Sequence, residues 1–117
     1  MSITRKLRTP IQHRVVRNGD TIYIGGAIAD DTSMSMGDQT QNILDKFETY
    51  LHEGGSDRYH VLTASIFVTD LSKKKEMDEV WTKFFGDHLP SRATVGVADL
   101  GGGALIEVVM TAKVKGS

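Results

Sequence analysis

The apolar segment from Tyr59 to Thr69 constrains the fold of this chain more than any other feature. It contains too many apolar positions for the strict alternation of a strand with one wet face: Val61, Leu62, Ala64, Ile66, Phe67 and Val68. Such a segment predicts a central strand with helices over one face. At 117 residues, the chain is expected to form a single domain over 1–117.

A β-hairpin is predicted for residues 13–28. Asn18-Gly19 is a strong hairpin-turn signal, because both positions tolerate positive φ. The following segment, 21–24, is rich in β-branched and aromatic residues, and Gly25-Gly26 then predicts a bulge or a close backbone approach. Residues 1–12 show no clear period, so no element is predicted there.

Two helices are predicted between the remaining strands. Asp38 is the candidate N-cap of the first helix and Gly54-Gly55 its end, with apolar residues on one face at Ile43, Leu44, Phe47 and Leu51. Ser72 is the candidate N-cap of the second and Gly86 its end, with an apolar stripe at Met77, Val80, Trp81, Phe84 and Phe85.

The last two strands are predicted over Arg92–Leu100 and Leu105–Val114, as an antiparallel hairpin turning at 101–103. The order is then β-β-α-β-α-β-β, an α+β fold with one mixed sheet and two helices on one face. Thr94, Gly96 and Ala98 would line the face that no helix covers. Small side chains on an uncovered face predict packing against another subunit, so we expect a homo-oligomer.

Composition excludes several classes of function. The net charge of −1 does not favour nucleic-acid binding, and the local basic residues Arg5, Lys6, Arg8, Arg14 and Arg17 are expected to be solvated. With no cysteine, thiol catalysis and Cys-ligated zinc are excluded, and the four histidines lack metal-ligand spacing. We therefore expect no metal, no cofactor and no membrane span. The absence of a secretory signal and of cysteine fits a cytoplasmic protein.

One constellation could carry chemistry. Arg92 and Glu107 lie on the two predicted C-terminal strands, and an antiparallel hairpin would bring them to the same region. Glu107 is surrounded in sequence by apolar residues, where a carboxylate is costly unless it is paired or functional. The alternatives are an Arg92–Glu107 ion pair and a site for a small carboxylate substrate.

Several segments resemble the Rid family, also called YjgF or endoribonuclease L-PSP. They cover most of the chain from about Val16 to Val114: 19–26, 39–44, 69–71, 77–81, Pro90 to Val95 and Ile106 to Val108. The Pro-x-Arg and Ile-Glu-Val motifs are the most specific. The resemblance implies a chorismate-mutase-like fold, assembled as a homotrimer around a central barrel with sites in the clefts between subunits.

The resemblance also implies an activity, the metal-free hydrolysis of reactive 2-imino and enamino acids, such as 2-iminopropionate and 2-aminoacrylate, to 2-keto acids and ammonia. By position, Arg92 would hold the substrate carboxylate, Glu107 would position the water and Thr94 would supply a backbone N–H. A bidentate arginine suits a carboxylate better than lysine does.

The chain departs from the best-studied branch of the family at three positions. Gly25 replaces a serine, Asp78 replaces an asparagine, and Thr94 replaces a common cysteine. An early tyrosine has no clear counterpart, although Gln12 or His13 falls nearby. These departures leave open a second function, non-catalytic binding of 2-keto acids. Endoribonuclease activity is a third alternative, which the charge does not favour.

Overall fold

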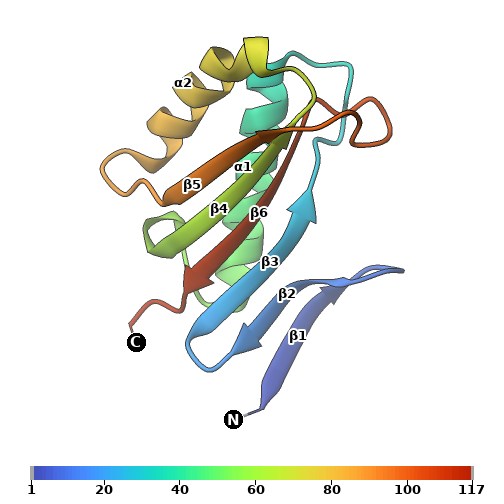
Figure 1. Cartoon of the computed structure of the whole chain (residues 1–117). Helices are drawn as coiled ribbons and strands as arrows, with labels where there is room; N and C mark the ends of the chain where they lie inside the picture. The colour runs from blue at the N-terminus through green and yellow to red at the C-terminus, as the bar shows by residue number, and fades with distance from the viewer. Residues whose placement is uncertain (1, 117) are drawn as a thin grey trace.

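The structure of the chain is a computed structural model that describes residues 2–116. It contains one six-stranded sheet and two α-helices (Figure 1). The elements are β1 (Ile3–Arg8), β2 (His13–Asn18), β3 (Thr21–Ala27), α1 (Met36–Gly54), β4 (Val61–Val68), α2 (Lys74–Phe85), β5 (Ser91–Gly96) and β6 (Ile106–Lys113).

The sheet is mixed, with strand order β1-β2-β3-β6-β4-β5, and both helices pack on one face (Figure 1). The other face carries no helix. All strand pairs are antiparallel except β4 and β5, which run parallel. The predicted α+β fold with two helices on one face is therefore confirmed, and β4 lies inside the sheet as its apolar sequence predicted.

The core lies between the sheet and the helices. The predicted helix faces are buried: Ile43, Leu44, Phe47 and Leu51 on α1, and Met77, Trp81, Phe84 and Phe85 on α2. The β2–β3 hairpin and the glycine bulge in β3 are also confirmed, since the register against β6 shifts between Ile24 and Ala27. Within residues 2–116, neither helix has the length and apolar character needed to cross a lipid bilayer.

β1 was not predicted. It pairs antiparallel with β2 at the edge of the sheet, and every one of its residues is exposed. A strand without a buried face needs no alternation of apolar residues, so residues 3–8 show no period in the sequence. Three of the basic N-terminal residues make specific contacts. Lys6 Nζ donates to the carbonyl of Glu53 and Arg17 Nε to that of Gly19, both at 3.0 Å, and the Arg14 guanidinium carbon lies 5.3 Å from the centre of the Tyr50 ring.

The predicted C-terminal hairpin is wrong. β5 pairs only with β4, in parallel, while β6 lies between β3 and β4. The glycines 101–103, all with positive φ, belong to a longer connection that passes over the end of β4. The predicted faces of β5 are also reversed. Thr94 and Gly96 face the helices, and the Gly96 backbone lies close to the Leu71 side chain beside α2.

Both predicted N-caps are displaced by a few residues. Ser35 caps α1, with its side chain accepting from the Asp38 N–H at 3.2 Å. Asp70 caps a short 3₁₀ turn, Leu71–Lys73, that precedes α2, and Ser72 donates its N–H to Asp70. The residue that accepts the capping hydrogen bond and the residue that donates it lie two or three positions apart. The sequence pattern therefore located each cap but did not distinguish the acceptor from the donor.

Candidate functional site

Arg92 lies on β5 and is held against α2. It is opposite Ala64 of β4, a buried residue on the helix side of the sheet. Its guanidinium carbon lies 5.4 Å from the centre of the Trp81 ring, and Nη2 lies 2.7 Å from Oδ1 of Asp78. Only 20% of the side chain is exposed. Helix α2 therefore fixes the position of the guanidinium through one aromatic contact and one ion pair.

A pocket of about 300 Å³ opens beside this guanidinium, lined by Asp78, Trp81, Thr82, Leu89, Pro90 and Arg92. Its walls are mainly apolar, and Arg92 and Asp78 supply the charged groups. A concave apolar surface with a few convergent polar groups is the usual form of a small-molecule site. Arg92 and Asp78 were predicted from the sequence, whereas the apolar wall formed by Trp81, Leu89 and Pro90 was not predicted as part of a pocket. Trp81 was assigned only to the core.

Asp78 also contacts a second cation. Lys74, one helical turn earlier, donates a hydrogen bond to Oδ2 of Asp78 at 2.7 Å. Burial raises the pKa of the Asp78 carboxyl, but the Lys74 hydrogen bond and the Arg92 guanidinium outweigh burial and hold that pKa below its usual range. The carboxylate is therefore ionised near neutral pH and lies between two positive charges. Lys74 carried no sequence signal except its spacing from Asp78.

Thr94 follows Arg92 on the same face of β5. Val97 donates its backbone N–H to Val68 on β4, and backbone groups alternate in direction along a strand. The N–H groups of Arg92 and Thr94 therefore point away from β4, toward the free edge of the sheet. The Thr94 hydroxyl oxygen is buried and has no hydrogen-bond partner within residues 2–116. The edge N–H fits the donor role that the resemblance implies for Thr94.

Glu107 lies elsewhere, on the face of the sheet that carries no helix. It is opposite Phe67 on β4 and is half-buried. Its carboxylate lies over the bulge in β3, because a Cβ built on Gly26 would clash with Oε2 of Glu107. The absence of a side chain at Gly26 thus makes room for the carboxylate. In the same way, a Cβ built on Gly25 would clash with Oε1 of Gln12.

Arg92 and Glu107 therefore leave opposite faces of the sheet. Their partners on β4, Ala64 and Phe67, are three positions apart, and side chains alternate faces along a strand. The alternative of an Arg92–Glu107 ion pair is wrong, because Arg92 pairs with Asp78.

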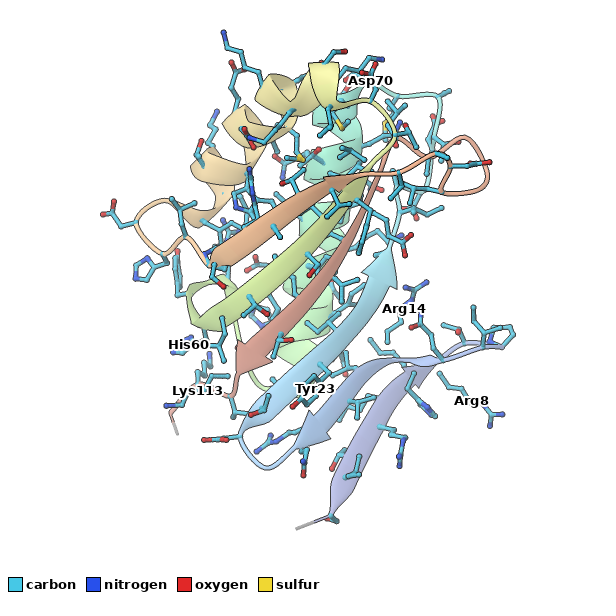
Figure 2. All side chains as sticks on the ribbon, in the orientation of Figure 1. Arg8, Arg14, Tyr23, His60, Asp70 and Lys113 are labelled. Carbon is cyan, nitrogen blue, oxygen red and sulfur yellow. The ribbon has the colours of Figure 1, made fainter. Side chains whose placement is uncertain are left out.

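The predicted site residues fall into two groups. Arg92, Thr94 and Asp78 form the arginine half, at the β5 edge and α2. Glu107, Gly25 and Gly26, with Gln12, form the glutamate half, on the open face (Figure 2 looks onto this face, with Tyr23 of β3 and Lys113 of β6 labelled). Gly26 was predicted to bulge, but its contact with Glu107 was not predicted.

The chain is similar to known proteins over most of its length. The model of the family described as endoribonuclease L-PSP matches residues 7–114. A RutC family protein from Pyrococcus abyssi is 26% identical over 90% of this chain and 89% of its own length. Protein DfrA from Myxococcus xanthus is 32% identical over 77% of this chain and 73% of its own length.

Solved structures are also similar. A member of the YjgF protein family from Neisseria meningitidis superposes with a TM-score of 0.94 and 27% identity, over 100% of this chain and 98% of that one. A protein of the YjgF/YER057c/UK114 family from Mycobacterium tuberculosis gives 0.88 and 28%, over 97% and 100%. From the match to nearly its whole length, this chain belongs to the endoribonuclease L-PSP family, the Rid/YjgF group that its motifs resemble.

Proposed function

We propose that this protein hydrolyses small 2-imino and enamino acids to 2-keto acids and ammonia, without a metal. The arginine half carries the proposal. A guanidinium that is mostly buried, fixed by Trp81 and open to an apolar pocket, suits a small molecule with one carboxylate. The Thr94 N–H at the free edge offers a further donor beside it.

The complete site requires a second copy of the chain. Within one chain the sheet separates Arg92 from Glu107, so a substrate held by Arg92 cannot meet the Glu107 of the same chain. The open sheet face and the free β5 edge both offer surfaces for assembly. In the proposed homotrimer, the β5 edge of one subunit lies over the glycine bulge of the next. Each cleft then joins one arginine half to one glutamate half.

In this cleft, Arg92 binds the substrate carboxylate and leaves the imine carbon facing Glu107 of the neighbouring subunit. An enamino acid first becomes the protonated imine by taking a proton from solvent at its terminal carbon. Glu107 then takes a proton from a water molecule as the water oxygen adds to the imine carbon, and passes that proton to the nitrogen, which becomes an ammonium leaving group. The carbon–nitrogen bond of this tetrahedral adduct then breaks. Ammonia leaves, the hydroxyl proton returns to Glu107, and a 2-keto acid remains. Because imines hydrolyse in water unaided, one arginine and one carboxylate are sufficient for this step.

The test is the release of pyruvate from 2-aminoacrylate generated by an auxiliary enzyme. The wild-type protein should accelerate release above the spontaneous rate. Arg92→Ala should lower kcat/KM by about a hundredfold, since it removes charge-assisted hydrogen bonds of about 1.5–3 kcal/mol. Arg58→Ala is the control, since Arg58 pairs with Glu48 and lies over the Phe84 ring but does not line this pocket. Equal rates for Arg92→Ala and the wild type would show that the assignment of Arg92 is wrong.

The Asp78–Arg92 ion pair favours a second candidate function, the binding of 2-keto acids without turnover. An internal carboxylate already occupies part of the arginine, and the serine and cysteine of the best-studied branch are replaced by Gly25 and Thr94. Calorimetry with pyruvate, together with the turnover assay, separates the two functions. Saturable binding with no acceleration of pyruvate release would favour the binding protein.

A further inference from the structure

The contacts of Asp78 with its two cations are unequal. Oδ2 accepts a well-formed hydrogen bond from Lys74 at 2.7 Å. Oδ1 lies at the same distance from Nη2 of Arg92, yet this oxygen is buried and has no aligned hydrogen-bond donor within residues 2–116. The Lys74 contact thus combines charge with good alignment, whereas the Arg92 contact is equally short but less well aligned. Because the two cations contact different oxygens, Asp78 can stay bound to Lys74 when Arg92 turns to a ligand.

We infer that Asp78 competes with the substrate carboxylate for Arg92, and that Lys74 sets the strength of this competition by holding Asp78 when a ligand binds. This inference rests on the proposed function, because it concerns the same arginine. It assigns two specificity-determining residues, Asp78 and Lys74, to the site.

The competition follows from charge and geometry. A ligand carboxylate that engages Arg92 through two hydrogen bonds must share the guanidinium with Asp78 or displace it, and two carboxylates side by side repel each other. Lys74 offsets that repulsion because it stays within hydrogen-bond distance of Asp78. Anion binding is therefore weaker than an unopposed arginine would give. A weakly held 2-keto acid also leaves the site readily after the reaction.

The chain offers matched controls for both residues. Glu79 and Lys75 are the exposed neighbours of Asp78 and Lys74 on α2, and neither takes part in a salt bridge within the described residues. Glu79→Gln removes the same negative charge as Asp78→Asn, and Lys75→Gln the same positive charge as Lys74→Gln. Any effect of overall charge on anion binding appears equally in these controls.

The experiment is calorimetric titration of pyruvate into the assembled protein and its variants. Asp78→Asn should tighten pyruvate binding by about tenfold, equivalent to about 1.4 kcal/mol. In the turnover assay it should lower KM while kcat changes less than about twofold. Lys74→Gln should weaken binding by about threefold in the wild-type background and much less in the Asp78→Asn background, because Lys74 acts through Asp78. Glu79→Gln and Lys75→Gln should leave the Kd nearly unchanged.

Other outcomes separate the possible errors. Unchanged or weaker binding by Asp78→Asn would show that Asp78 only positions Arg92, and the inference would be overturned. Equal tightening by Glu79→Gln would attribute the effect to overall charge. An equal effect of Lys74→Gln in both backgrounds would overturn the part assigned to Lys74. If Asp78→Asn does not assemble, as judged by gel filtration and circular dichroism, Lys74→Gln and Lys75→Gln alone decide the inference: equal effects overturn it. Arg92→Ala is measured alongside and should lose pyruvate binding. If it does not, the proposed role of Arg92 fails, whatever the Asp78 variants show.

Discussion

The two halves of the candidate site are built in opposite ways. The arginine half lies on the helix-backed side of the sheet, where Trp81 packs against the guanidinium and Asp78 balances its charge. The glutamate half lies on the open side, where the absence of side chains at the Gly25–Gly26 bulge makes room for Glu107 and Gln12. One half is thus complete in its packing and charge, whereas the carboxylate of the other half has no ion-pair partner within residues 2–116. A single chain therefore carries both parts of the candidate site but keeps them on opposite faces of its sheet.

The largest predicted effect comes from separating the two halves on different chains. Arg92→Ala and Glu107→Gln should each lose most activity, Glu107→Gln by about a hundredfold or more as expected for a general base. When the two variants are unfolded together and refolded, some clefts regain an intact Arg92 and an intact Glu107 from different chains. Random assembly in a closed ring should restore about a quarter of the wild-type rate.

The controls are each variant refolded alone and the two variants mixed without unfolding. None of these preparations should exceed the activity of the single variants, unless subunits exchange spontaneously. A mixture that forms trimers by analytical ultracentrifugation but stays inactive would mean that one chain supplies both residues. The structure would then have to change greatly on assembly, because the sheet now lies between them.

The next effect concerns the glutamate half alone. Gly26→Ala places a methyl group where Oε2 of Glu107 lies, and the flexible end of that side chain must move. Gly26 does not have positive φ, so alanine fits its backbone without strain. We expect kcat to fall by about ten- to a hundredfold, because a shift of about 1 Å in a catalytic group can cost that much. Pyruvate affinity at Arg92 should change far less.

Gly25→Ala is the matched control for this prediction. It adds the same methyl group one residue earlier, where the side chain that must move is Gln12 rather than Glu107. Thermal unfolding of both variants should show similar, small changes in Tm. If Gly25→Ala lowers kcat as much as Gly26→Ala does, the bulge matters as a whole and Glu107 is not the group that was displaced.

Local sequence patterns predicted much of the fold correctly. They predicted the surroundings of the arginine half poorly. The turn at Asn18-Gly19, the β3 bulge and both apolar helix faces were evident because each depends on neighbouring residues alone. The pairing of β5 with β4 was not evident from the sequence. A glycine-rich connection suggests a hairpin, and no local signal distinguishes it from a parallel partner reached through α2. This error placed Arg92 and Glu107 on adjacent strands.

Site residues were predicted to the extent that a motif contained them. Arg92 and Glu107 lie in the two most specific motifs, and Asp78 was noted as a departure from the family. The contact between Asp78 and Arg92 depends on how α2 packs on β5, which no spacing in the sequence reports. Lys74 and Leu89 were missed for the same reason. Packing between distant segments decides these contacts, and the sequence records only which residues are available.

The smallest predicted effect tests whether the arginine half is balanced by charge. Asp78 has a pKa below its usual value, so its pairing stabilises the folded protein above the ordinary aspartate pKa, and this contribution is lost as pH falls through the lower, folded-state pKa. Because the pair is partly exposed, the contribution should be about 1 kcal/mol or less. Asp78→Asn should therefore be slightly less stable than the wild type at pH 7, and the difference should shrink as pH falls below the ordinary aspartate pKa, in denaturant titrations at one protomer concentration. Glu79→Gln, at the exposed neighbouring position, should show no such convergence. A difference for Asp78→Asn that persists unchanged into acid would mean that the aspartate acts through shape and not through its charge, and the contrast between a charge-balanced half and an unpaired half would lose its electrostatic basis.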